Sequence, residues 1–197
     1  MTRSIVASRP WSRVKWTRAV QVAPLLGDEG AGLPANQTPA EAFAALRTEQ
    51  PALAARFAAQ VLPRIDAARW MAACLACGPR SAEPARMVAD KAVRRWVASP
   101  SDEARRLAFE AGSVAGFDTP EGSACLAIFL SGGSIAPAEQ QTPLNPAPGT
   151  FGQAVAGTVL LAAYSQGPIA FPERIAAMLD LADRIAAGDP LDAGTYG

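Results

Sequence analysis

Apolar residues along most of the chain recur every three or four positions, which is the spacing of one face of an α-helix. In the segment 172–187 the residues that share this face are Ile175, Met178, Leu179, Ala182, Ile185 and Ala186. Asp180 and Arg184 lie on the opposite, polar face at a spacing that lets them pair. No segment alternates apolar and polar residues over the length of a useful strand, so the pattern predicts an all-α protein.

The boundaries of the helices are marked by proline at the first helical position and by glycine after the last. Thr38-Pro39-Ala40-Glu41 adds a capping box, in which hydroxyl and carboxylate each accept from a free backbone N–H. The segments predicted to be helical are 39–48, 51–61, 64–77, 84–98, 101–115, 120–131, 150–164 and 172–187. We therefore expect a single compact bundle of seven or eight helices.

Two segments lack helical periodicity. Residues 24–37 are rich in glycine, proline and asparagine and are predicted to be a linker. Residues 134–149 contain four prolines among polar residues, which indicates a long irregular loop with some polyproline II character. The expected organisation is a basic N-terminal arm and linker over 1–37, followed by a helical domain over 38–197.

Composition narrows the possible chemistry. The 197 residues include no histidine, which excludes serine triads, cysteine–histidine dyads and most zinc sites. The carboxylate pairs Asp180/Asp183 and Asp102/Glu103 lack the apolar surroundings that would raise a pKa for acid–base work. Alanine, at 44 positions, favours closely packed helices. We expect no catalytic residues, no metal and no cofactor.

Charge is unevenly distributed although the net charge is zero. Residues 1–22 carry five basic groups and no acid, whereas the rest of the chain has 13 basic and 18 acidic residues. Such an arm could bind nucleic acid, anionic lipid or its own domain. A secretory signal needs an uninterrupted apolar stretch, and basic residues interrupt residues 3–18 of the arm too often for one. The longest apolar run, 154–164, is about half the length of a membrane span, and three cysteines suit a reducing compartment. We expect a cytoplasmic protein with no membrane span.

A Cys-x-x-Cys motif is formed by Cys74 and Cys77. Redox dithiols lie at a helix N-terminus, where the helix dipole lowers the pKa of the thiol. This pair instead falls at the C-terminal end of the helix that is predicted to begin near Arg64. We therefore interpret both cysteines as core packing, with redox use or metal binding as alternatives.

Two further motifs suggest a binding surface. Ser131-Gly132-Gly133-Ser134 could form a nest of N–H groups for an anion, but it follows a helix, so helix termination is the favoured interpretation. Arg94-Arg95-Trp96 and Arg105-Arg106 are basic pairs of a kind found on nucleic-acid surfaces. Because acids surround the second pair, a solvated, salt-bridged helix face is favoured there.

The tryptophans Trp70 and Trp96 lie on apolar helix faces, which favours core anchoring with a partner for each indole N–H. If they lined one accessible groove, they would instead bind a partner. The candidate partner-binding residues are Trp70, Trp96, Ser131, Gly132, Gly133 and Ser134.

Several motifs resemble an uncharacterised family of small alanine-rich helical bacterial proteins associated with type VI secretion gene clusters. They are Leu62-Pro63-Arg64 before Trp70, Trp96-Val97 before Pro100-Ser101, and the segment 131–148. The resemblance implies an accessory or adaptor role and supplies no catalytic residues. The basic arm has no counterpart in the family pattern.

We therefore expect a non-enzymatic helical adaptor, chaperone or accessory protein that binds another protein, such as a secretion-system component or effector. The partner would dock on a helical groove, with the 134–149 loop as a second contact. Two alternatives remain open, a thiol-dependent redox protein using Cys74 and Cys77, and a nucleic-acid-associated regulator using the basic arm.

Overall fold

The computed structural model describes residues 9–137 and 140–189, and within these ranges it contains helices and no strands. The eight predicted helices are all present. They are α2 (Pro39–Glu49), α3 (Pro51–Val61), α4 (Arg64–Ala76), α5 (Pro84–Ala98), α6 (Asp102–Ala115), α7 (Pro120–Phe129), α8 (Thr150–Tyr164) and α9 (Phe171–Ala187). The all-α expectation is confirmed, and the described part of 134–149 forms no helix, as predicted.

The segment predicted to be a linker is instead folded onto the bundle. It follows the 3-10 helix η1 (Ala19–Val22) and contains most of α1 (Ala23–Leu26) and the 3-10 helix η2 (Gly27–Gly32). Gly30 permits this turn, since a Cβ there would lie 2.2 Å from the carbonyl oxygen of Ala23. Val22 and Leu33 belong to the hydrophobic core. The described chain thus has nine α-helices rather than seven or eight, while the domain boundary at residue 37 stays a prediction.

Helix starts follow the predicted capping chemistry. The Glu41 backbone N–H donates to Thr38 Oγ1 at 3.3 Å, and the Thr38 N–H donates to the Glu41 carboxylate at 2.8 Å. Ser101 Oγ caps α6 and Thr119 Oγ1 caps α7 in the same way. Each hydroxyl satisfies a first-turn N–H that has no partner inside the helix. The capping box predicted at Thr38 is confirmed.

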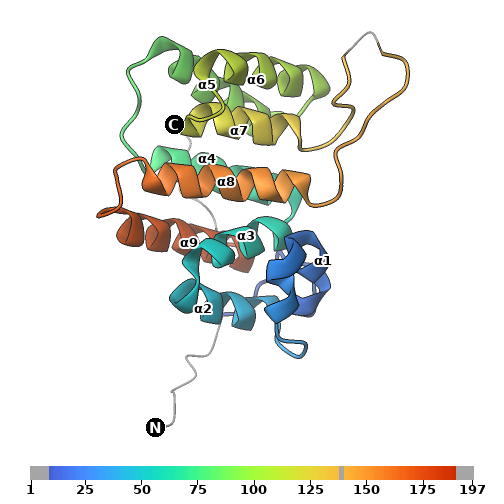
Figure 1. The fold of residues 1–197 in the computed structure, drawn as a ribbon, viewed down its shortest axis with the longest axis vertical. Coiled ribbons are helices and arrows are strands. Elements are labelled where there is room, and N and C mark those ends of the chain that lie inside the picture. Colours follow the sequence, from blue (N-terminus) through green and yellow to red (C-terminus); the bar gives the residue numbers. More distant parts are fainter. Residues whose placement is uncertain (1–8, 138–139, 190–197) are drawn as a thin grey trace.

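Figure 1 shows α5, α6 and α7 gathered at one end of the molecule, α4 and α8 across its middle, and α9, α3 and α2 toward the other end. Helix α8 is central, because it packs against α3, α4, α7 and α9. Small residues allow the helices to approach closely. At Gly112 on α6, for example, a Cβ would lie 2.6 Å from the Cβ of Cys125 on α7.

Candidate functional site

A groove of about 890 Å³ lies where α4, α5, the end of α9 and the N-terminal segment meet. Part of its lining is apolar, with Val97, Ala98 and Ile185. The charged lining residues are the cations Arg13, Arg69, Lys91, Arg94 and Arg95 and the carboxylates Asp66 and Asp189. Cations outnumber carboxylates, so the groove is basic although the chain as a whole is neutral.

Helix geometry brings these side chains together. Lys91, Arg94 and Arg95 follow an i, i+3, i+4 spacing on α5 and therefore share one side of that helix. Asp66 and Arg69 are three residues apart on α4, so they too are neighbours. We name this feature the basic groove.

Both carboxylates of the basic groove are already neutralised by arginine. The side chain of Asp66 is only 3% exposed and accepts from Arg13 Nη2 at 2.9 Å and from Arg69 Nη1 at 3.3 Å. Asp189 is bound by Arg9, and this hydrogen bond holds the pKa of the Asp189 carboxyl below its usual value. Neither carboxylate is left to neutralise the cations on α5.

The cations on α5 have hydrogen-bonding capacity to spare. Lys91 and Arg95 are exposed, and neither makes an ion pair within the part of the chain that the structure describes. Arg94 Nε donates to Asp90 at 2.8 Å, but its Nη1 is buried and has no partner. A buried donor without an acceptor costs free energy. The exposed groups of Lys91 and Arg95 are therefore the donors that an added acceptor in the groove could reach.

The N-terminal arm binds its own domain over its described part, one of the three targets considered from the sequence. Trp11 Nε1 donates to Asp183 Oδ1 at 2.7 Å, and the Arg13 backbone N–H donates to Ala186 O at 2.9 Å. The Trp11 ring lies 5.0 Å from the ring of Phe43. Residues 1–8, at the start of the arm, lie outside the described residues.

The two candidate tryptophans do not line the basic groove. Trp70 has no exposed surface and donates from Nε1 to Met178 O at 2.7 Å, while Trp96 is 6% exposed. A docked partner touches only exposed atoms, so Trp70 cannot contact one and Trp96 offers almost no surface. This corrects their candidacy as partner-binding residues, and the favoured interpretation, core anchoring with a bonded indole N–H, holds for Trp70.

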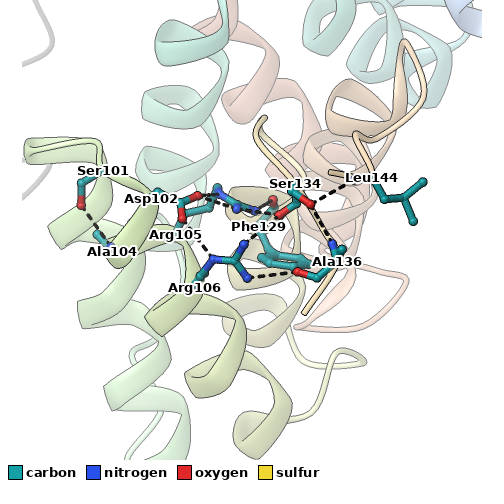
Figure 2. Close-up of polar contacts among 9 residues, drawn as sticks. All are labelled: Ser101, Asp102, Ala104, Arg105, Arg106, Phe129, Ser134, Ala136 and Leu144. Carbon is teal, nitrogen blue, oxygen red and sulfur yellow. Dashed lines mark hydrogen bonds and ion pairs between the residues drawn. The ribbon is translucent and has the colours of Figure 1, made fainter. Parts of the chain in front are cut away.

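The Ser131–Ser134 loop wraps around arginine side chains of α6, as Figure 2 shows. Arg105 is 3% exposed and donates to Phe129 O at 2.7 Å and to Ser134 O at 2.8 Å. Its guanidinium carbon lies 4.8 Å from the centre of the Phe129 ring. Arg106 donates more weakly, at 3.3 Å, to the same Ser134 carbonyl.

The side chains and glycines of this loop are also occupied within the chain. Ser131 is buried, and Ser134 Oγ accepts from the backbone N–H groups of Ala136 and Leu144. A Cβ at Gly132 would lie 2.8 Å from Arg64 Nη1, and one at Gly133, where φ is +72°, would lie 3.3 Å from Arg105 Nη2. The loop therefore presents carbonyl oxygens to its own cations, which is unlike an anion-binding nest.

Arg105 is thus buried, which corrects the expectation of a solvated helix face at Arg105-Arg106. The salt-bridged part of that expectation holds, because Asp102 accepts from Arg105 at 2.6 Å and from Arg106 at 3.0 Å. These bonds, with that of Arg105 foremost, hold the pKa of Asp102 below its usual value.

The cysteines lack the features of a redox pair. Burial raises the pKa of the Cys74 thiol well above its ordinary value and also raises that of Cys77. Cys77 is exposed at the C-terminal end of α4, which corrects its assignment to the core, whereas Cys74 is buried as predicted. Cys125 is also buried, and its pKa is raised to about 12. Protonated thiols are poor nucleophiles and poor metal ligands.

Among the described residues, no cluster of three or more cysteine, aspartate or glutamate side chains is arranged to hold a metal ion. The same part of the chain contains no helix with the length and apolarity that crossing a bilayer requires.

The basic groove is the feature that sequence reasoning missed. Two signals were available: the Arg94-Arg95 pair, which was considered as a nucleic-acid surface, and the basic arm, for which its own domain was one of three possible targets. Arg13 and Asp66 are 53 positions apart in the chain, and no local pattern indicates that the arm returns to α4.

Comparison with known proteins identifies a family for this fold. No curated protein and no solved structure matches the chain. The model of a family of unknown function, DUF6931, matches residues 42–186, which include nearly all of α2 to α9. The uncharacterised family expected from the sequence motifs is thus supported at this level, and the chain belongs to the DUF6931 family.

Proposed function

We propose that this protein is a non-enzymatic helical adaptor that binds an acidic segment of a partner protein in the basic groove. The observation that carries the proposal is the presence of exposed Lys91 and Arg95 beside carboxylates that other arginines already neutralise. A partner that brought its own carboxylates would supply the missing counter-charges.

The chemistry of the groove suits a peptide ligand. Its volume of about 890 Å³ lies near the upper end of the range for small-molecule sites, which leaves room for several residues of an extended segment. Arginine guanidinium groups bind carboxylates through two parallel hydrogen bonds, which gives geometric specificity as well as attraction. Val97, Ala98 and Ile185 supply apolar surface for the side chains between the acids.

A role without catalysis accords with the groups that line the groove. Its two carboxylates are engaged by arginine, and none of the three cysteines lines it. The motif resemblance supports placing the partner among type VI secretion components, as an effector or as part of the machinery. The protein would then act as an accessory factor or chaperone for that partner.

The test is fluorescence anisotropy of a labelled ten-residue Asp/Glu-rich peptide titrated with the full chain. The variant Arg69→Gln/Arg95→Gln removes one paired and one unpaired cation from the groove. The matched control, Arg56→Gln/Lys15→Gln, removes a half-exposed arginine paired with Glu29 and an exposed lysine, both outside the groove.

We expect the groove variant to bind the peptide about tenfold more weakly and the control to bind like the unmodified chain, with affinity falling as salt rises. Equal loss in both variants would indicate non-specific charge attraction and contradict the proposal. Tighter binding of a single-stranded oligonucleotide than of the peptide would favour the nucleic-acid alternative instead.

A further inference from the structure

A second groove, of about 660 Å³, lies between α5 and α6 at the end of the molecule seen at the top of Figure 1. It is lined mainly by apolar side chains, three of which are large and exposed. Val88 is 58% exposed, Leu107 39% and Val114 76%. We name the surface formed by Ala85, Val88, Ala92, Leu107, Ala111 and Val114 the apolar face.

The apolar face follows helix periodicity on both of its helices. The α5 residues Ala85, Val88 and Ala92 are spaced i, i+3, i+7, and Leu107, Ala111 and Val114 on α6 are spaced i, i+4, i+7. Stripes of this kind are buried against another helix in most proteins. Here the alanines of both stripes are half-buried against the bundle, whereas the larger Val88, Leu107 and Val114 stay exposed, and contiguous exposed apolar surface commonly marks an interaction site.

Opposite charges border the two sides of the apolar face. On α5 the bordering residues are Lys91 and Arg95, which make no ion pair with a described residue. On α6 they are Glu110, which lines the groove, and exposed Glu103, which precedes it by two helical turns on the same stripe. The basic residues of α6, Arg105 and Arg106, are engaged with the Ser131–Ser134 loop.

We propose that the apolar face binds a second copy of this chain in a symmetric dimer. Helices α5 and α6 are consecutive, are joined by three residues and pack against each other, so they run antiparallel. A twofold axis parallel to them would place α5 of each copy on α6 of the other. The surface is then its own complement, as a twofold interface requires.

This arrangement pairs the charges as well as the apolar stripes. With a rise of about 1.5 Å per residue, Arg95 lies level with the start of α6 and Lys91 about 6 Å further along. Glu103 and Glu110 of the second copy are seven residues, about 10.5 Å, apart on the facing helix, so each acid lies within about 3 Å of the level of one of these cations. The basic edge of α5 in each copy thus meets the acidic edge of α6 in the other copy. This contact occurs twice in the dimer, across an interface of four helices. An arbitrary apolar helix would not have to satisfy this charge pattern.

The test is complementation between two charge-reversed variants of the full chain, measured as mass by analytical ultracentrifugation. Variant one is Lys91→Glu/Arg95→Glu, and variant two is Glu103→Lys/Glu110→Lys. Each variant alone opposes like charges at both contacts. A mixture opposes unlike charges at both, because the acidic α5 of variant one meets the basic α6 of variant two, and the other contact is unmodified.

We expect a dimer for the unmodified chain, monomers for each variant alone, and a dimer in the equimolar mixture. Val114→Asp places a charge within the interface and is expected to raise the dimer dissociation constant about a hundredfold. Ile169→Asp, at an apolar residue that is 96% exposed and outside the apolar face, is expected to leave it unchanged.

A monomeric unmodified chain at all concentrations, or variants that fail to complement each other, would overturn the inference. This outcome would leave the proposed function untouched, because acidic-peptide binding by the Val114→Asp variant reports the basic groove separately. Conversely, loss of peptide binding in the groove variant says nothing about the mass of the unmodified chain.

Discussion

Arg105 shows how a single buried cation can fix a loop that has no secondary structure of its own. Its guanidinium donates to Asp102 and to two backbone carbonyls, those of Phe129 and Ser134. A buried arginine is tolerated only where such acceptors surround it. Sequence reasoning found the Arg105-Arg106 pair and its acidic neighbours. It could not find the carbonyl acceptors, which lie 24 and 29 positions further along the chain.

Replacement of Arg105 by methionine is expected to lower the free energy of unfolding by about 3–5 kcal/mol, because the buried Phe129 carbonyl would lose its donor and the Ser134 carbonyl would keep only the longer bond from Arg106. Urea denaturation measures the change. Arg106→Met is the matched control, since Arg106 is 30% exposed and makes longer bonds to the same loop. Its expected cost is about 1 kcal/mol. Equal costs for the two variants would show that burial of Arg105 is unimportant.

At the scale of the element, the helix boundaries were predictable because capping is local chemistry. Thr38 and Glu41 are three residues apart, and the side chain of each accepts a hydrogen bond from the backbone N–H of the other. The one-turn helix α1 was not predicted, because four residues show no periodicity. Its position depends on contacts with distant helices such as α3. Structure that depends on residues within one helical turn could thus be predicted from the sequence. Structure that depends on contacts with a distant helix could not.

Two glycines within helices give opposite expectations for the same substitution. Gly112→Ala is expected to destabilise the protein by about 2–3 kcal/mol, because its Cβ would lie 2.6 Å from Cβ of Cys125 and force α6 away from α7. Gly157→Ala on exposed α8 surface meets nothing within 4 Å. It is expected to stabilise by about 0.5–1 kcal/mol through helix propensity. Thermal unfolding of both variants checks the signs, and a stabilising Gly112→Ala would refute close α6–α7 packing.

For the whole molecule, the all-α fold class followed from the pattern of apolar positions, whereas the basic groove did not. Arg13, Asp66 and Lys91 come from three separate segments and meet only once the chain is folded. Periodicity indicates which face of a helix is buried, but it does not indicate which other helix covers that face. Periodicity was sufficient for the tryptophans, which were favoured as core anchors and are buried, and their burial removes them as candidates for partner binding.

Docking of the N-terminal arm is expected to depend on Arg13 more than on Arg9. The guanidinium of Arg13 donates two hydrogen bonds to the Asp66 carboxylate, whose side chain is 3% exposed. Arg13→Ala removes both bonds and is expected to lower the free energy of unfolding by about 2 kcal/mol. Arg9→Ala removes a partner of Asp189, which is 27% exposed, and is expected to cost less than Arg13→Ala because solvent screens this pair. Chemical denaturation of both variants makes the comparison, and the reverse ranking would contradict arm docking through Asp66.

Helix α5 separates the basic groove from the apolar face, and Lys91 and Arg95 line both surfaces. The same two positive charges cannot fully serve two acidic ligands at once. If both proposals hold, pairing of two copies and capture of an acidic client would therefore be antagonistic, and each would weaken the other by the same factor. Abundance of the protein would then set how much of it is free to receive cargo, with no need for a separate regulator.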